Sequence, residues 1–488
     1  MQTGAEVETS RLGGLISNLR AGTRSYASDL PASRSHVFLG RVPREEFGMY
    51  GQLPTSRLPG PLIAVPRFRA LAALLRCQCY SADVSSRLMA CIALPFASLI
   101  APAADDGVLR QAYDARDWFM LRDAVRSGTH PLFYRAAVSV AFNDPENALK
   151  ELESVIGSSP RSNRAYEARE LLTYLQWRRG DYRQARMQLQ QMLALKPDAD
   201  DVKKFLGLFT LLSTLPPQRV EKRRISKIAT STQDALRGPI TINGVRRNYL
   251  FDTGANFSVI SVSQARQLRL STSRGSKETL GDGRPPYSLT VGDVALSDRI
   301  VIGDTTIRNV AFLIQPDERF TDTPEEQRGV IGLPVILALR TIRWVKGESL
   351  EFGFPSERRD AYRSNLCFDS AFSVVTVEFG QSRLNLSFDT GATLTDLYAR
   401  FGRDFPEFVK AGRKGSAQRT GAGGTVRDEV VVVPDLHLRL GGFPGLLRSA
   451  NMYPNENSPW HGNLGMDLLR EARVVTIDFD AMRLTLSQ

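Results

Sequence analysis

The chain has 488 residues with a formal net charge of +11, and its 42% hydrophobic content provides core material for two to four domains. Residues 1–87 carry 11 arginines, no lysine and 6 acidic residues, so much of the positive excess lies there. The rest of the chain is only mildly basic and has no basic stripe with interleaved aromatic residues, which argues against a nucleic-acid partner.

Cysteine and histidine usage argues against a metal site. The cysteines are Cys77, Cys79, Cys91 and Cys367, and the histidines are His36, His130, His437 and His461. The first two cysteines have no matching second pair and the histidines lack ligand spacing, so we expect no metal and no cofactor. If the apolar segment described next is cleaved, Cys367 is left alone and cannot form an intrachain disulfide.

Two segments precede the first predicted domain. Residues 1–84 are rich in Arg, Ser, Gly and Pro without a sustained period, and we expect a disordered leader. Residues 85–104 have the outline of a secretory signal, with Arg87, an apolar run over 88–100 and a small-x-small ending. Secretory signals, however, sit at the extreme N-terminus.

Three interpretations of this segment compete. Translation could start near Val84 or Met89, in which case the leader is not made. The segment could be an uncleaved signal anchor, although it is shorter than the ~20 residues of a spanning helix, or it could be a buried core helix. We expect export to the periplasm or the medium with a mature N-terminus near Ala104, and membrane attachment only if the segment stays uncleaved.

Residues 106–215 have a helical pattern built from two similar units. The pattern predicts a helix, a tight turn and a helix over 132–156, and the same design over 166–195, each unit being closed by a proline. An earlier turn at 115–118 and a closing helix at 202–215 flank this pair. Small residues at the helix crossings and an aromatic residue after the turn resemble the tetratricopeptide repeat, although the interval exceeds the usual ~34 residues.

The predicted repeats have two possible roles. Stacked helix pairs offer a concave groove, so the region could dock substrate or a protein partner. It could equally be a structural cap on the domain that follows.

The remaining chain has the texture of β structure. Residues 216–236, with Pro216-Pro217 and a basic run, are predicted to be a linker. After them, short apolar runs are broken by Gly, Asn, Asp and Pro. We expect two all-β lobes at 237–356 and 366–488, which makes the whole chain a multidomain α + β protein.

One pentapeptide occurs twice, as Phe251-Asp252-Thr253-Gly254-Ala255 and Phe388-Asp389-Thr390-Gly391-Ala392. Each copy ends a predicted strand, and in the first copy an Asn-Gly hairpin turn precedes that strand. Each copy is later followed by an apolar-Gly-apolar tripeptide, around Gly332 or Gly465, then by a short helix and a closing hairpin. Features that recur in the same order predict a duplicated lobe that contributes one carboxylate per copy.

Asp-Thr-Gly-Ala after an apolar strand, followed by an apolar-Gly pair and a helix, resembles the retropepsin-like aspartic peptidases. The resemblance covers about residues 236–488. It implies a pseudo-dimeric acid-protease fold, in which one chain supplies the two lobes that retroviral members assemble from identical subunits. We therefore expect a monomer, since a homodimer built from one lobe per chain is not needed.

The resemblance implies that Asp252 and Asp389 flank a lytic water. Hydrolysis of an amide without a covalent intermediate requires an activated water and a proton donor for the leaving nitrogen. In aspartic proteases as a class, two carboxylates about 3 Å apart cannot both ionise, so the pair holds one proton and acts as base and acid together. Thr253 and Thr390 would cross-link the two loops through hydroxyl-to-backbone hydrogen bonds.

The glycines of the motifs are also given roles by the resemblance. Gly254 and Gly391 would permit a tight turn and leave amides free to bind the carboxylates. Gly332 and Gly465 would pack beneath the loops, where a side chain would clash.

Two features depart from the family pattern or match it weakly. The family often has Ser or Thr after the Ala, whereas this chain has Asn256 and Thr393, so the outer hydrogen bonds of the lobes are expected to differ. Residues 281–288 and 420–424 have the glycine content of a mobile hairpin lid but no distinctive motif.

The sequence thus predicts an aspartic endopeptidase that acts on a polypeptide substrate. Retention of both Asp-Thr-Gly copies favours catalysis, because binding a peptide does not require two carboxylates in contact. The alternatives are a module that holds an extended peptide without cutting it, and a scaffold whose main function lies in the repeats.

Overall fold

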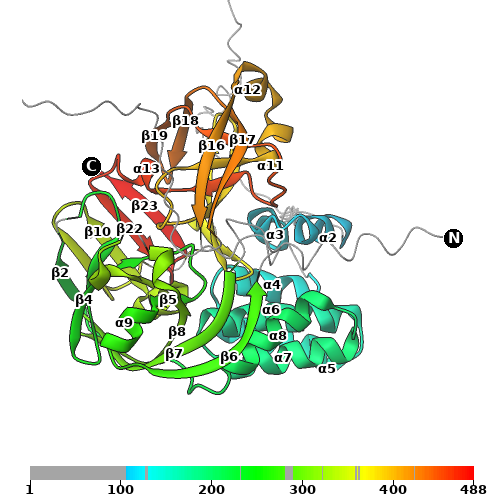
Figure 1. The fold of residues 1–488 in the computed structure, drawn as a ribbon. Helices are drawn as coiled ribbons and strands as arrows, with labels where there is room; N and C mark the ends of the chain where they lie inside the picture. Colours follow the sequence, from blue (N-terminus) through cyan, green and yellow to red (C-terminus); the bar gives the residue numbers. More distant parts are fainter. Residues whose placement is uncertain are drawn as a thin grey trace, which may run out of the picture. The chain divides into compact units, whose positions relative to one another are not determined.

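Helices come first along the described chain and strands dominate the rest, as the sequence pattern predicts (Figure 1). The computed structural model describes residues 106–126, 130–230, 232–280, 289–320, 323–357, 360, 363–421 and 424–488. The predicted leader, the signal-like segment at 85–104 and most of the lid candidates, at 281–288 and 422–423, lie outside the described residues.

The helical region contains α2 (Asp106–Asp114), α3 (Trp118–Val125), α4 (Leu132–Ala141), α5 (Pro145–Ser158), α6 (Asn163–Arg178), α7 (Tyr182–Leu195) and α8 (Asp200–Leu212). Side chains of Asp117, Ser162 and Asp181 cap the amino ends of α3, α6 and α7 by accepting a backbone N–H bond. The pairs α4–α5 and α6–α7 are the two predicted helix–turn–helix units. None of the helices in the described part of the chain has the length and apolar character needed to cross a membrane.

The first β region forms a closed barrel. Its elements are β1 (Arg219–Lys222), β3 (Arg237–Ile242), β4 (Val245–Phe251), β5 (Ser258–Ser261), α9 (Val262–Gln267), β6 (Ser271–Leu280), β7 (Leu289–Ile302), β8 (Thr305–Gln315), β9 (Gly329–Ile331) and α10 (Leu333–Leu339). The sheet order is β1-β8-β5-β9-β4-β3-β7-β6, and β7 also pairs with β8. The ring β8-β5-β9-β4-β3-β7 is therefore closed, which leaves no unpaired edge among these strands.

The second β region repeats the strand pairing of the first. Its elements are β12 (Leu366–Asp369), β13 (Phe372–Phe379), β14 (Ser382–Phe388), β15 (Asp396–Tyr398), α11 (Ala399–Asp404), α12 (Pro406–Ala411), β16 (Arg413–Gly421), β17 (Gly424–Val432), β18 (Leu436–Leu440), β19 (Phe443–Leu447), β20 (Asn451–Tyr453), β21 (Gly462–Leu464) and α13 (Met466–Leu469). The parallel pair β14–β21 corresponds to β4–β9, and the antiparallel pair β15–β21 corresponds to β5–β9. The parallel pair β15–β20 corresponds in turn to β5–β8.

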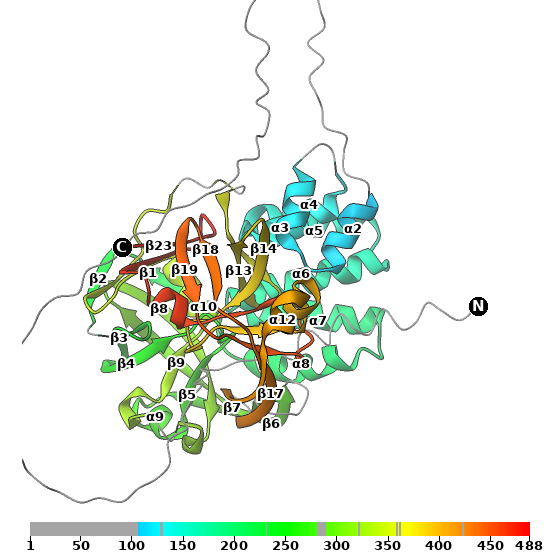
Figure 2. The ribbon, with the colours of Figure 1, turned by 90° about the horizontal axis from the view of Figure 1, so that it is seen from above.

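The two regions differ where the barrel closes. In the first region β7 and β8 are long and continuous, whereas in the second the corresponding path is divided into β17 and β18, and into β19 and β20. Pro434 lies in the first of these breaks, and it has no backbone N–H to donate to a neighbouring strand. Figure 2 shows the hairpin β18–β19 beside β13 and β14.

A third sheet joins the two β regions. Its order is β2 (Ser226–Ala229), β11 (Ser349–Phe352), β10 (Thr341–Val345), β22 (Val474–Asp478) and β23 (Arg483–Ser487). The central pair is β10–β22, which are antiparallel and come from the two closing hairpins predicted from the sequence. The closing hairpin of each β region, β10–β11 or β22–β23, is thus paired with that of the other region.

The stretch 216–236, predicted to be a linker, contains two strands. β1 pairs with β8 at the edge of the first sheet, and β2 pairs with β11 at the edge of the joining sheet. Such short strands have little pattern of their own, and their hydrogen-bond partners lie far along the chain. The prolines and the basic run were the clearest features of this stretch, and they led to the prediction of a linker.

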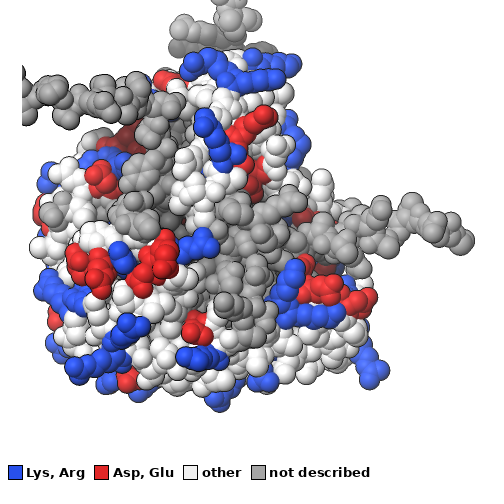
Figure 3. All heavy atoms as spheres, viewed as in Figure 1, with Lys and Arg blue, Asp and Glu red and all other residues white. Residues whose placement is uncertain are grey.

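Charged side chains of both signs are interspersed on the face shown in Figure 3. Among the described residues, Arg308 forms an exposed ion pair with Glu221 at 2.8 Å. Exposed pairs of this kind contribute at most about 1 kcal/mol each, so the fold depends on its core rather than on them.

Candidate active site

The two predicted aspartates lie at equivalent places in the two β regions. Asp252 follows β4 and donates its backbone N–H to Ile331 O in β9, while Asp389 follows β14 and donates to Leu464 O in β21. These distances are 2.9 and 3.0 Å. Asp252 is 0% exposed and Asp389 2% exposed, so both carboxylates are withdrawn from bulk water.

The same backbone groups hold each carboxylate. Oδ1 of Asp252 accepts N–H bonds from Gly254 at 2.8 Å and Ala255 at 3.1 Å. Oδ1 of Asp389 accepts them from Gly391 at 2.9 Å and from Ala392 at 3.1 Å. A carboxylate held by two N–H donors keeps its orientation and its charge is stabilised.

Thr253 and Thr390 connect the two loops in a reciprocal way. The Thr253 hydroxyl donates to Phe388 O at 2.8 Å and accepts from the Thr390 N–H at 3.0 Å. The Thr390 hydroxyl donates to Phe251 O at 2.7 Å and accepts from the Thr253 N–H at 3.0 Å. Each hydroxyl therefore makes two buried hydrogen bonds to the opposite loop.

Gly254 and Gly391 lie where each aspartate loop approaches the carboxylate of the opposite loop. A Cβ added to Gly254 would lie 2.5 Å from Cγ of Asp389. A Cβ added to Gly391 would lie 2.3 Å from Oδ2 of Asp252. No side chain fits in either place, because contacts under about 3 Å force atoms to move. The two carboxylates are thus brought together at one place between the loops.

Gly332 and Gly465 lie under the two loops. A Cβ on Gly332 would be 2.4 Å from the backbone oxygen of Phe257, and one on Gly465 would be 2.4 Å from that of Leu394. Each glycine precedes a short helix, α10 or α13, whose first N–H donates to the loop above it. These contacts fix the position of each aspartate loop relative to the helix that follows its glycine.

The environments of the two aspartates are not identical. Nδ2 of Asn463 in β21 lies 3.4 Å from Oδ2 of Asp389. The residue at the same place in β9 is Val330, which cannot donate. Sequence reasoning missed Asn463, although the polar residue inside Gly462-Asn463-Leu464 was a visible difference from the apolar first copy.

Asn256 and Thr393 differ in their outer contacts, as the departure from the family pattern predicted. The backbone oxygen of Asn256 accepts the indole N–H of Trp177 at 3.2 Å, whereas that of Thr393 accepts from Arg470 at 3.1 Å. The side chain of Asn256 is buried, and neither of its polar atoms has a hydrogen-bond partner among the described residues.

The helical region contacts the loop that carries Asp252. The Trp177 ring in α6 lies 4.9 Å from the Phe257 ring, between their centroids. Phe205 and Phe209 of α8 pack on the same indole. Trp177 therefore supports the first aspartate loop through both its ring and its N–H.

The helical region also contacts the second β region. Arg116, in the turn before α3, pairs with Asp369 at 2.8 Å, and the indole N–H of Trp460 donates to the other oxygen of that carboxylate at 3.0 Å. Arg178 at the end of α6 donates to Ser370 O at 3.1 Å. Burial lowers the pKa of Arg178 to about 9, with its guanidinium 4.1 Å above the Phe368 ring.

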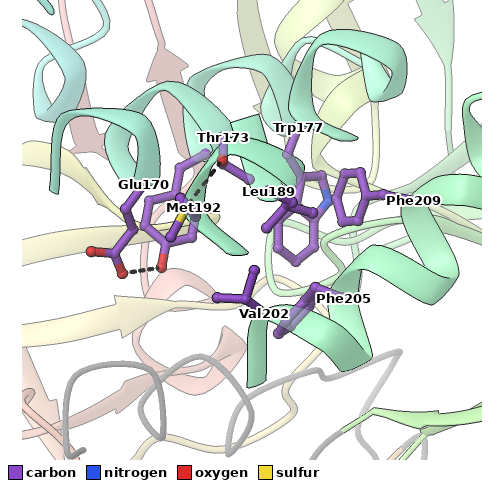
Figure 4. A pocket seen from close by; sticks show the side chains of 9 residues that line it. Glu170, Thr173, Trp177, Leu189, Met192, Val202, Phe205 and Phe209 are labelled. Atoms are coloured by element: carbon purple, nitrogen blue, oxygen red, sulfur yellow. Dashed lines mark hydrogen bonds between the residues drawn. The ribbon is translucent and has the colours of Figure 1, made fainter. Parts of the chain in front are cut away.

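The helices leave little space between them. The cavity among α6, α7 and α8 has a volume of about 10 Å³, and its lining is mainly apolar (Figure 4). The polar groups that line it form hydrogen bonds with each other. For example, the Tyr174 hydroxyl donates to Glu170 at 2.8 Å. A space of this size holds one water at most.

The described residues contain no group of three or more His, Cys, Asp or Glu side chains that could hold a metal ion. Cys367 is buried, and burial raises the pKa of its thiol, which disfavours the nucleophilic thiolate. Nδ1 of His461 accepts from the Asn385 N–H at 3.0 Å and its Nε2 lies 3.1 Å from Asp404. Burial lowers the pKa of His461, so this histidine is a hydrogen-bonded structural residue.

Comparisons with known proteins match part of the chain. Residues 238–335 match a family described as Aspartyl protease. The solved structures that match include a retropepsin-like aspartic protease from Rickettsia conorii, with 13% sequence identity, a TM-score of 0.19, and an alignment that covers 28% of this chain and 92% of that one. A search among curated proteins gave no match. Residues 238–335, which contain Asp252, are therefore similar to this aspartyl protease family.

Proposed function

We propose that this chain is an aspartic endopeptidase in which Asp252 and Asp389 activate the attacking water. The observation that carries the proposal is the close approach of each carboxylate to the glycine of the opposite loop. Two buried carboxylates at one place cost folding free energy, because like charges in a site of low dielectric repel each other. Such an arrangement is typical of a catalytic site rather than of a packing contact.

In the proposed reaction the aspartate pair holds one proton. A water between the carboxylates gives a proton to the ionised member as its oxygen adds to the peptide carbonyl carbon, while the protonated member hydrogen-bonds the carbonyl oxygen. The carbon–nitrogen bond then breaks as the nitrogen takes up a proton from the pair. The products are a carboxyl group and an amine, and the pair again holds one proton.

The residues around the pair have positioning roles in this proposal. The N–H groups of Gly254 and Gly391 fix one oxygen of each carboxylate, and the threonine hydroxyls keep the two loops at a constant separation. Fixed geometry matters because a displacement of about 1 Å can lower a rate by about a hundredfold.

We further propose that the two β regions are the two lobes of a pseudo-dimeric acid-protease fold and that a monomer is sufficient for activity. The repeated strand pairing and the joining sheet through β10–β22 support this interpretation. Helices α4 to α7 are proposed to be tetratricopeptide-like. Because α6 and α8 pack on the first lobe through Trp177, their structural role is favoured over a docking groove on that side.

The second candidate function is a peptide-binding module that does not cut. The asymmetric contact of Asn463 with only one aspartate is compatible with it, since a non-catalytic site tolerates divergence. Polypeptide would be the ligand in both cases.

Cleavage of a mixed peptide library tests the proposal. Wild-type protein is expected to cut, and Asp252→Asn and Asp389→Asn are each expected to abolish cutting with a melting temperature near that of the wild type. Asp298→Asn, which makes the same change at an exposed position of β7, is the matched control and is expected to cut normally. Equal cleavage by either active-site variant would refute the shared pair, and a pepstatin-type inhibitor should block only a true aspartic peptidase.

We also propose that the protein is exported, on the pattern of residues 85–104. N-terminal sequencing of the protein from its natural host is expected to find a mature start near Ala104. Recovery of residue 1 would contradict export by cleavage, and recovery in the membrane fraction would support the anchored alternative.

A further inference from the structure

A cavity of about 210 Å³ lies where the helical region, the segment that joins the β regions, and the second β region meet. Its lining comes mainly from α3, residues 363–365, β13, β14, β18 and β23, and the strands β13, β14 and β18 are neighbours in one sheet (Figure 2). Since a space of about 10–15 Å³ holds one water, this cavity can hold a small molecule. Arg383 lines it six residues before Asp389, about 20 Å along an extended strand, so the cavity is apart from the aspartate pair.

Arginine side chains dominate the lining of this cavity, which we call the arginine cavity. Five arginines line it, and the only acidic residue in the lining is Glu378. The five are Arg122, Arg363, Arg383, Arg439 and Arg483. A hollow lined mainly by one sign of charge concentrates ions of the opposite sign, so the arginine cavity attracts anions.

Two of these arginines are already held firmly by the protein. The Arg122 guanidinium is buried, lies 2.9 Å from Asp123 and donates to Ser364 O at 2.8 Å. Arg483 donates to Glu357. These two side chains therefore shape the wall and contribute charge, but their main contacts are within the protein.

Arg383 and Arg439 are held much more loosely. Glu378 of β13 is directly opposite Arg383 of β14 and Arg439 of β18, so the three residues form a row on one face of the sheet. Arg439 lies 3.9 Å from Glu378 and donates one hydrogen bond, to Gly442 O at 2.8 Å. Arg383 lies 3.9 Å from Asp123 and makes no hydrogen bond to any residue that the structure describes. Charge-assisted hydrogen bonds are about 2.7–2.9 Å long, so both guanidiniums retain N–H donors for a ligand.

We propose that the arginine cavity binds a phosphate group and that Arg383 and Arg439 are its main donors. The planar fork of a guanidinium matches the oxygens of a phosphate in pairs. The arginines reach the cavity from five separate elements, so their N–H groups approach from several directions. A tetrahedral phosphate has oxygens in several directions, whereas a carboxylate has two oxygens in one plane. Free phosphate, a phosphate monoester and the headgroup of phosphatidic acid share this chemistry.

Calorimetric titration of the full chain with inorganic phosphate tests the proposal, at constant ionic strength because salt screens exposed charges. Phosphate is expected to bind, and acetate is expected to bind at least about tenfold more weakly. Arg383→Gln and Arg439→Gln should each weaken phosphate binding by about tenfold to a hundredfold, the range of one hydrogen bond to a charged group. Arg448→Gln is the matched control, because Arg448 is an exposed arginine of the same β region, 3.6 Å from Asp435, that does not line the cavity. It should bind phosphate as the wild type does.

Glu378→Gln gives a test of opposite sign that does not depend on the folding of the arginine variants. Removing the one carboxylate of the lining should tighten phosphate binding by about twofold to fivefold, the range of one exposed charge pair. Sedimentation with phosphatidylcholine vesicles, with and without phosphatidic acid, separates the two sources of the phosphate. Binding only to vesicles that contain phosphatidic acid, and only when both arginines are present, would identify a lipid headgroup.

This inference does not depend on peptide cleavage, so either proposal can fail alone. Binding of inorganic phosphate or of phosphatidic acid vesicles that requires Arg383 and Arg439 supports it. It would be overturned by the absence of binding to either probe, by binding that is unchanged in Arg383→Gln and Arg439→Gln, by acetate binding as strong as that of phosphate, or by weaker phosphate binding in Glu378→Gln.

Discussion

The reciprocal threonine bonds can be tested by Thr253→Val. Valine has nearly the shape of threonine but no hydroxyl, so Phe388 O and the Thr390 N–H would each lose a buried partner. Thr253 is 1% exposed, and water has no ready access to replace these bonds. Phe388 O keeps the Ser373 hydroxyl as a donor, so the Thr390 N–H is the group left without that partner, which costs about 1–3 kcal/mol. The lost bond to Phe388 O adds about 1 kcal/mol, and the expected loss in unfolding free energy is about 2–4 kcal/mol.

Denaturant titration of the full chain measures this loss, and peptide cleavage measures the effect on the site. Thr253→Ser keeps the hydroxyl and is the matched control, expected to lose about 1 kcal/mol or less for the missing methyl group. If the loops move apart by about 1 Å, cleavage by Thr253→Val should fall about a hundredfold.

The mirror substitution gives a check on the reasoning. Thr390→Val should cost about as much as Thr253→Val, and the double variant should cost clearly less than their sum because both side chains belong to one hydrogen-bond network. A loss below about 0.5 kcal/mol for either variant, or strict additivity, would refute the idea that these bonds hold the loops together.

Three other predictions follow from single contacts. Gly391→Ala should abolish cleavage, because the new Cβ would lie 2.3 Å from Oδ2 of Asp252, and retained activity would contradict the close approach of the loops. Trp177→Phe removes the donor to Asn256 O but keeps a ring, so denaturant titration should show a loss of about 1–2 kcal/mol, whereas an unchanged midpoint would argue against that bond. Burial lowers the pKa of His461 in the folded state, so as the pH falls below about 6.5 the imidazole is protonated in the unfolded chain before it is protonated in the folded one. Protonation therefore favours unfolding, and the stability contributed by the neutral His461 is present above about pH 6.5 and is lost below it. His461→Gln should lose that part of the pH dependence, which unfolding titrations at pH 7 and pH 5 measure, and an identical slope in both proteins would contradict it.

Local pattern was enough to find the duplicated elements of the fold. Strands β4 and β14, helices α10 and α13, and the closing hairpins lie where the repeated motifs predicted them, because each is specified by a few adjacent residues. The retropepsin-like resemblance is confirmed for residues 238–335. The roles of Asp252 and Asp389 stay predictions until cleavage is measured.

The register of the strands and the contacts between distant segments could not be predicted from the sequence. The polarity of Asn463 was visible, but its position beside Asp389 depends on the pairing of β14 with β21. In the same way, Arg116 gave no sign that it would pair with Asp369 in the second β region. Such contacts join segments far apart in sequence, and no periodic pattern records them.

The contacts of the helical region bear on its two predicted roles. A docking domain needs a free inner face, but Trp177 and Phe209 are packed on Phe257 in one cluster that also includes Val294 and Ala371 of the β regions. Cutting the chain before β1 would expose these apolar side chains to water, so the β regions alone are expected to lose solubility or stability. Because Phe257 lies five residues after Asp252, that loss would reach the aspartate loop itself. These contacts support the proposal that the helices hold the loop that carries Asp252, rather than forming a separate recruiting module.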